Sequence, residues 1–184
     1  MIDTAHRLTL PQQAAVARVA YAVEQPNAFA LMCGPAGVGK TLVLKHVAAA
    51  RQLHPRKMIL TTLASAAAML ADSGPVGQSD MLQPHTLLID DAHLAREGEL
   101  TELLDRTRSK LPTAGLVLAG HGRLLSLVAR DSRLEQAVRL RATLPPFTLD
   151  ESRLLVATML AATGSLQERD QDRKSTRLNS SHQI

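Results

Sequence analysis

Apolar residues along most of the chain form short continuous runs that alternate with helical repeats. The runs have strand length and cover residues 28–33, 57–63, 86–89, 115–119 and 142–144. Elsewhere apolar residues recur three and four positions apart, the period of one helix face. These helices are predicted at residues 11–24, 42–53, 64–71, 94–111, 124–138 and 148–162. Because strands alternate with helices, we expect an α/β fold with a mostly parallel sheet of about five strands and helices on both faces.

The periodic pattern ends shortly after a clear helix start. Thr148 is followed three positions later by Glu151, which is the combination of a capping box. After Gly164 the chain is polar and has no period, so residues 167–184 are predicted to be a disordered or non-native tail. Residues 174–182 resemble a translated read-through, and a native disordered terminus is the alternative.

Composition excludes some functions and leaves others open. The chain has 184 residues, 2% of them aromatic, and a formal charge of +4. So few aromatic rings argue against the base-stacking surfaces of single-strand nucleic-acid binders, and the mild positive charge permits DNA as a partner without supporting it. Cys33 is the only cysteine, which favours a reducing, cytoplasmic setting in which Cys33 is a small buried hydrophobe. No apolar run approaches the ~18 residues of a membrane span.

The segment Gly34–Thr41 reads GPAGVGKT and matches the phosphate-binding pattern G-x-x-x-x-G-K-[ST] between a predicted strand and a predicted helix. Glycines permit backbone angles that a side chain forbids, so amide groups can approach phosphate oxygens closely. The following helix directs free N–H groups and its positive dipole end at the same anion. We expect a nucleotide to contact Gly34, Pro35, Ala36, Gly37, Val38, Gly39, Lys40, Thr41 and Leu42.

Side chains with separate tasks follow this loop. Lys40 brings a mobile positive charge to the outer phosphates, and Thr41 offers a hydroxyl to magnesium. Asp90 ends an apolar strand and is the second predicted magnesium ligand. Asp91 is the candidate for orienting or deprotonating an attacking water, and the alternative is that it only caps the next helix. His93 is interpreted as a solvated loop residue, with sensing of the nucleotide state as the alternative.

Two further positions complete the candidate catalytic set. His121 follows the strand that we expect between the acidic strand and the phosphate-binding strand, where it can contact the outer phosphate or the attacking water, although Gly120 and Gly122 also fit a plain turn. Arginines gather near the last helix and strand, and one of them can act on the nucleotide of a neighbouring subunit. Arg139 is the first candidate and Arg141 the second.

Together these residues resemble the AAA+ ATPases, and within them the group of general secretion pathway protein A and the transposition-helper ATPases. The resemblance covers about residues 8–164 and depends on three segments: Gly34–Thr41, LLIDDAH at residues 87–93, and the strand with its glycine at residues 116–120. It implies an ATP- and magnesium-dependent switch or motor. The expected organisation is an ATPase core at residues 1–147 and the start of a helical lid at residues 148–166, with the rest of the lid missing.

The resemblance also implies subunits that meet at the nucleotide, with Arg139 or Arg141 as the arginine finger, and a protein partner in a secretion or transposition complex. One departure concerns hydrolysis, because the family usually has Glu where this chain has Asp91. Asp is one methylene shorter, so hydrolysis is expected to be slow. The alternative function is a nucleotide-dependent binding module with little or no turnover. A kinase is less favoured, because it would need an arginine-rich lid. A GTPase is less favoured, because the sequence lacks the Asn-Lys-x-Asp segment that reads the base.

Overall fold

The computed structural model of the chain describes residues 8–50, 57–72, 85–158 and 160. Leu8–Pro146 form one unit, and the described residues from Phe147 onward belong to a second unit. The first unit contains a five-stranded sheet in the order β2-β3-β4-β1-β5, and every pair of neighbours is parallel. Its strands are β1 (Phe29–Cys33), β2 (Lys57–Thr62), β3 (His85–Asp90), β4 (Gly115–Gly120) and β5 (Leu140–Thr143). The predicted fold class is confirmed.

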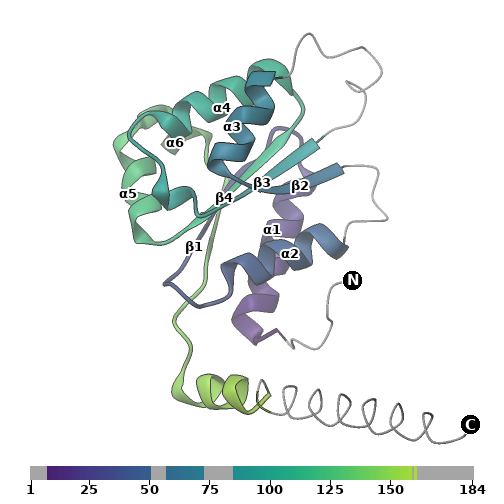
Figure 1. The fold of residues 1–184 in the computed structure, drawn as a ribbon, viewed down its shortest axis with the longest axis vertical. Coiled ribbons are helices and arrows are strands. Elements are labelled where there is room, and N and C mark those ends of the chain that lie inside the picture. Colours follow the sequence, from purple (N-terminus) through teal and green to yellow (C-terminus); the bar gives the residue numbers. More distant parts are fainter. Residues whose placement is uncertain (1–7, 51–56, 73–84, 159, 161–184) are drawn as a thin grey trace, which may run out of the picture. The chain divides into compact units, whose positions relative to one another are not determined.

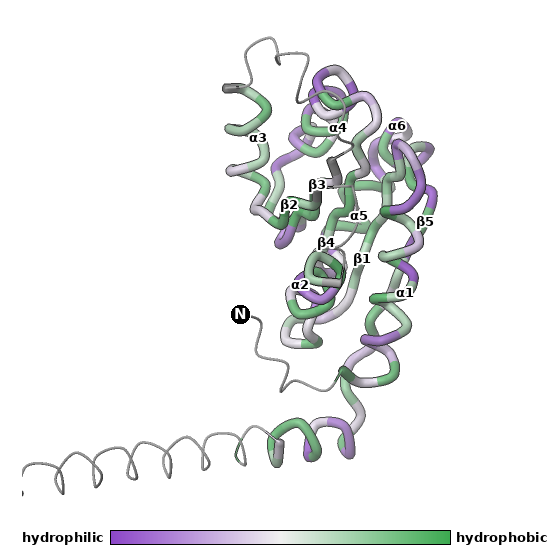
Figure 2. Tube along the Cα trace, turned by 90° about the vertical axis from the view of Figure 1, so that its right-hand side faces the viewer, coloured by the Kyte–Doolittle hydropathy of each residue, from purple (hydrophilic) through white to green (hydrophobic). Residues whose placement is uncertain are grey.

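Helices cover both faces of this sheet (Figure 1). They are α1 (Leu10–Glu24), α2 (Lys40–Ala50), α3 (Leu63–Asp72), the 3-10 helix η1 (Ala92–Leu94), α4 (Glu99–Lys110), α5 (Gly122–Arg130) and α6 (Ser132–Ala137). Successive side chains of a strand point to opposite faces, so each buried strand supplies two separate cores. The two central strands β1 and β4 are accordingly apolar along their whole length, as their green tubes show (Figure 2).

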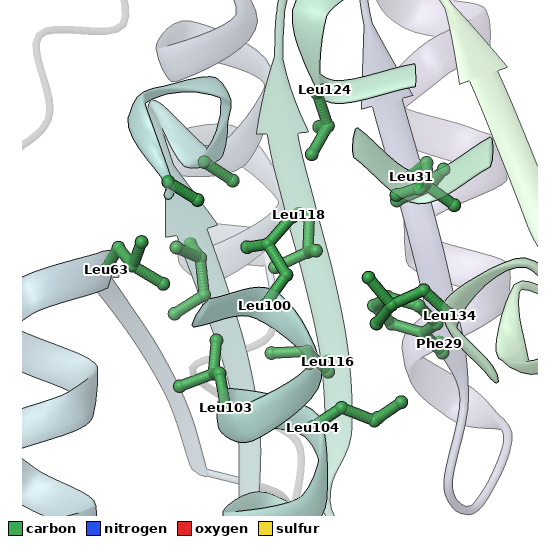
Figure 3. Close-up of a cluster of buried hydrophobic side chains, with 14 of the residues drawn as sticks. Phe29, Leu31, Leu63, Leu100, Leu103, Leu104, Leu116, Leu118, Leu124 and Leu134 are labelled. Atoms are coloured by element: carbon green, nitrogen blue, oxygen red, sulfur yellow. The ribbon is translucent and has the colours of Figure 1, made fainter. Parts of the chain in front are cut away.

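The two cores contain alternate residues of the same strands. Ala30 and Met32 of β1 pack with Val19 of α1 and Leu44 of α2 on one face. Phe29 and Leu31 lie on the other face, in a leucine-rich cluster with α3, α4, α5 and α6 (Figure 3). The leucines that this cluster takes from the helices are Leu63, Leu70, Leu100, Leu103, Leu104, Leu124 and Leu134.

The strand order makes the carboxyl ends of β4 and β1 a topological switch point. α2 follows β1 and packs on one face of the sheet, whereas α5 follows β4 and packs on the other. In parallel α/β sheets, ligands bind outside the carboxyl ends of neighbouring strands whose connections leave toward opposite faces. The candidate phosphate loop and His121 both lie at this position, because they follow β1 and β4 respectively.

Two helices that the apolar period predicted as continuous are interrupted. The helix expected at residues 124–138 is divided into α5 and α6 by Asp131, whose carboxylate accepts hydrogen bonds from the amides of Arg133 (2.9 Å) and Leu134 (3.3 Å). The hydroxyl of Thr101 also donates to this carboxylate and is the main reason that the pKa of Asp131 is lowered. The helix expected from residue 94 begins only at Glu99, because Gly98 has a left-handed φ of 81°.

In the second unit, residues 149–158 are helical. The predicted capping box is confirmed, since the Thr148 amide donates to Glu151 Oε2 (2.8 Å) and the Glu151 amide donates to Thr148 Oγ1 (3.2 Å). The division into a core and a lid stays a prediction, and the predicted tail at residues 167–184 lies outside the described residues. Within the part of the chain that the structure describes, no helix has the length and apolar character needed to cross a membrane.

Adjacent leucines of α5 test the assignment of the leucine-rich core. Leu124 is fully buried in it, whereas 41% of Leu125 is exposed. We expect Leu124→Ala to lower the free energy of unfolding by about 2–5 kcal/mol, because it leaves a cavity. Leu125→Ala should cost only about 0.5 kcal/mol. Urea unfolding measures both, and equal losses would contradict the packing described here.

Candidate nucleotide-binding site

Residues 34–39 connect the end of β1 to the start of α2, in the order that a phosphate-binding loop requires (Figure 1). Gly37 and Gly39 have φ angles of 80° and 88°, in the left-handed region that favours glycine. At Gly34 a Cβ would lie 2.6 Å from the carbonyl oxygen of Leu144. Each glycine of the motif is therefore required by the backbone. Leu42 is half-buried in the first turn of α2, and Pro35 and Ala36 are exposed.

Lys40 is the first residue of α2, and its side chain bends back over the loop. Its ammonium group donates to the carbonyl oxygens of Gly34 (3.0 Å) and Pro35 (2.7 Å). The residue is 9% exposed, so its charge is held inside the loop rather than in bulk solvent. This position suits a cation that neutralises a phosphate bound by the same loop.

The loop and the acidic strand meet through one hydrogen bond. The hydroxyl of Thr41 donates to Asp90 Oδ2 at 2.5 Å, although the two residues are 49 positions apart. Asp90 Oδ1 accepts the amide hydrogen of Asp91 at 2.9 Å, which orients the carboxylate. The structure thus brings together both residues that the sequence assigned to magnesium.

These two residues fit Mg²⁺ by the chemistry of their oxygen donors. Magnesium in phosphate-binding enzymes uses one or two protein oxygens, with water and substrate phosphates as its remaining ligands. Among the described residues, no group of three or more His, Cys, Asp or Glu side chains could hold a metal ion by itself. A hydroxyl and a carboxylate beside a phosphate loop therefore suit magnesium bound together with a nucleotide.

Asp91 lies just beyond β3 in the left-handed region, with φ 51°. It occupies the N-cap position of η1, but its side chain makes no capping hydrogen bond. The carboxylate is 62% exposed, and Oδ1 lies 3.9 Å from Nδ1 of His93. The structure therefore gives no support to the alternative that Asp91 only caps the next helix.

The interpretation of His93 as a solvated loop residue is wrong. Its side chain is only 13% exposed, and its ring centroid lies 3.6 Å from that of His121, with the planes tilted by 45°. Gly120 allows this approach, since a Cβ there would lie 3.0 Å from the Cβ of His93. The guanidinium of Arg123 donates to the carbonyl oxygens of His93 (2.8 Å) and Ala95 (3.1 Å), which holds η1 in place.

The pair of histidines joins the ends of β3 and β4. His121 caps α5, and its Nδ1 accepts the amide hydrogen of Arg123 at 3.3 Å. No motif in the sequence predicts this contact. Its one signal is that both histidines follow the carboxyl ends of strands predicted to be neighbours.

The structure does not bring the two candidate arginine fingers to the loop of their own chain. The amide of Arg139 donates to the carbonyl of Phe29 (2.9 Å), at the start of β1, whereas the loop follows the end of that strand. Arg141 lies 3.8 Å from Glu135 and is half-exposed. Their action on a neighbouring subunit stays a prediction.

No protein-family model and no curated protein matches the chain. Several solved structures resemble it. The ORC1 protein of Aeropyrum pernix in complex with DNA is 20% identical over 88% of this chain, with a TM-score of 0.62. The ORC2 protein of the same organism in its ADP form is 15% identical over 90% of this chain, with a TM-score of 0.59. This chain spans about half of each, 52% and 54%. The DnaC helicase loader is 16% identical over 77% of this chain and 94% of its own, with a TM-score of 0.52.

These neighbours are AAA+ P-loop ATPases. The chain has the AAA+ P-loop fold. The identities are too low to carry function across, so the similarity concerns the arrangement of the sheet and helices. Within the AAA+ fold, the finer resemblance to secretion and transposition ATPases is not confirmed by these structures.

Burial gives His93 a titration that differs from that of a free histidine. Burial is the main cause that lowers the pKa of His93. His121, Lys40 and Arg123 lower this pKa further, and the carboxylate of Asp91 raises it. The unfolded chain has a histidine pKa of about 6.5. Between that value and the lower folded value, the unfolded state binds more protons, so stability decreases as the pH falls through this window.

We therefore expect His93→Gln to make the folded unit Leu8–Pro146 less sensitive to acid. The free energy of unfolding of the wild type should fall between pH 7 and pH 5, and that of His93→Gln should fall less, because glutamine does not titrate. Urea unfolding at several pH values measures this difference. Parallel pH profiles for the two proteins would contradict the burial of a neutral His93.

Proposed function

We propose that this chain binds ATP with magnesium, hydrolyses it slowly, and uses the nucleotide to switch the state of a partner assembly. One observation carries the proposal: the hydrogen bond between Thr41 and Asp90, which joins the phosphate loop to the acidic strand. A glycine-rich turn without this function has no need for a carboxylate beside its Ser/Thr position. The AAA+ fold supports the same proposal.

Nucleotide binding follows from the loop, the lysine and the metal ligands. The backbone N–H groups of residues 36–41 would face the phosphates, and the positive end of α2 adds to their attraction. Lys40 exchanges its two carbonyl partners for phosphate oxygens. Thr41 and Asp90 would hold magnesium, which would neutralise negative charge on the phosphates.

Hydrolysis requires a group that accepts or orients a water proton. Asp91 is exposed beside the proposed metal ligand Asp90, and its Oδ1 lies 3.9 Å from Nδ1 of His93. His121 follows β4, between the strands that carry Asp90 and the loop, and its place suits contact with the outer phosphate. Asp91 has the shorter reach of aspartate, which is why we propose slow turnover.

A nucleotide-dependent binding module is the second candidate function. It is favoured by the position of Asp91, which has left the strand and is largely exposed. A general base works best when it is held within hydrogen-bond reach of its water. If the carboxylate is not held there, the chain retains ATP without hydrolysing it.

The partner assembly is the least constrained part of the proposal. The resemblance in sequence favours a secretion or transposition complex, with subunits that meet at the nucleotide through Arg139 or Arg141. Among the structural neighbours, one is a protein in complex with DNA and one is a helicase loader. A transposition complex is compatible with both, and the single cysteine favours a reducing, cytoplasmic setting.

Lys40→Ala tests nucleotide binding. We expect ATP with magnesium to raise the melting temperature of the wild type, because a ligand of the native state stabilises it. Lys40→Ala should lose most of this shift, and Lys45→Ala, which removes an exposed charge from the same helix, should keep it. Absence of any shift in the wild type at millimolar ATP would contradict the proposal.

Asp91→Asn tests hydrolysis separately from binding. Asparagine keeps the size of the side chain but cannot accept a proton, so we expect hydrolysis to fall by roughly 10²-fold while ATP affinity is retained. Asp91→Glu restores the longer side chain and should hydrolyse at least as fast as the wild type. Single-turnover hydrolysis at saturating ATP measures these rates. Equal rates for Asp91→Asn and the wild type would favour the binding module.

A further inference from the structure

A glutamine of the first helix, Gln12, makes a hydrogen bond to the backbone of the phosphate loop. Gln12 lies in the first turn of α1 and is only 4% exposed. Its Nε2 donates to the carbonyl oxygen of Val38 at 3.0 Å, and its Oε1 accepts the amide hydrogen of Thr9 at 2.9 Å. Both ends of this buried amide are therefore used, one on the helix start and the other on the loop.

The bond to Val38 determines the orientation of one peptide unit. Planar trans peptides place the C=O and N–H groups on opposite sides, and the described residues contain no cis bond. Because the Val38 carbonyl points toward Gln12, the N–H of Gly39 points away from it. Of the two residues that this peptide joins, Gly39 has a positive φ of 88° and no side chain that would restrict the peptide's rotation.

The side chain of Gln12 also explains the glycine at position 39. A Cβ at Gly39 would lie 2.5 Å from Nε2 of Gln12. The amide of Gln12 thus occupies the space that a side chain at position 39 would need. Val38 itself is 3% exposed, so its side chain is anchored in the core beside the peptide that Gln12 holds.

We propose that Gln12 is a positioning residue for the phosphate loop, which fixes the Val38–Gly39 peptide so that the Gly39 N–H is held ready for a phosphate oxygen. The inference rests on the proposed ATP binding and assigns part of it to a residue outside the motif. A donor that is already oriented gives tighter binding than one that must be ordered when the anion arrives. Loss of Gln12 therefore weakens phosphate binding without removing any group that touches the nucleotide.

The neighbouring Gln13 provides a matched control. It also donates its side-chain amide to a backbone carbonyl, that of Leu8 at 2.9 Å, but it is exposed and does not contact the loop. Gln12→Met and Gln13→Met make the same chemical change at adjacent positions of α1. The affinity for ATP with magnesium is measured by calorimetry on both variants and the wild type, and the stability of each protein without nucleotide by urea unfolding.

We expect Gln12→Met to weaken ATP binding about tenfold, the scale of one lost buried hydrogen bond, and Gln13→Met to stay within about twofold of the wild type. If Gln12→Met does not fold, Gln12→Asn and Gln13→Asn make the same comparison, since asparagine keeps a neutral amide that is too short to reach Val38. A Gln12 variant that loses stability but binds ATP like its Gln13 control overturns the inference. Absence of ATP binding by the wild type and the Gln13 control overturns the proposed function and this inference with it.

Discussion

The position of β4 between β3 and β1 is the constraint on which the candidate site depends. Parallel strands end at a common edge, so this order places Asp90, His121 and the phosphate loop together although they are far apart in the chain. The helices that follow β1 and β4, α2 and α5, lie on opposite faces of the sheet, which is the topology at which parallel α/β sheets usually bind ligands. The hydrogen bond between Thr41 and Asp90 connects residues that follow β1 and end β3, two strands that lie on either side of β4.

Much of this architecture could be predicted from local signals. The buried strands are continuous apolar runs, and the phosphate loop has glycines at positions where the backbone has positive φ or no room for a Cβ. The break between α5 and α6 could not be predicted in this way. Asp131 accepts amide hydrogens there and is supported by Thr101, which lies 30 positions earlier in the chain. The apolar period shows which face of a helix is buried. It does not show a helix cap that is stabilised by a hydrogen bond from another helix.

The candidate site shows the same division. Lys40, Thr41 and Asp90 follow from spacing and residue type alone, and the structure brings the three together. The burial of His93 could not be predicted from spacing and residue type. It depends on the absence of a side chain at Gly120 and on the two hydrogen bonds that Arg123 donates to η1 and its flank. Gln12 has no motif at all, since its importance lies in a contact with Val38, 26 positions away. Groups that touch a ligand leave a pattern in sequence more often than groups that hold other residues in position.

The phosphate loop is held in place by more hydrogen bonds than Asp91 is, and this difference bears on how a nucleotide could act as a switch. Gln12 of α1 donates a hydrogen bond to the Val38 carbonyl of the loop, and Asp90 of β3 accepts one from Thr41, which follows the loop. Asp91, by contrast, is exposed, and its Oδ1 lies 3.9 Å from Nδ1 of His93. The ring of His93 contacts that of His121, so the two histidines form a connected pair beside Asp91 at the ends of β3 and β4. In the proposed function, binding therefore relies on groups held by hydrogen bonds, while hydrolysis depends on a carboxylate that is largely exposed.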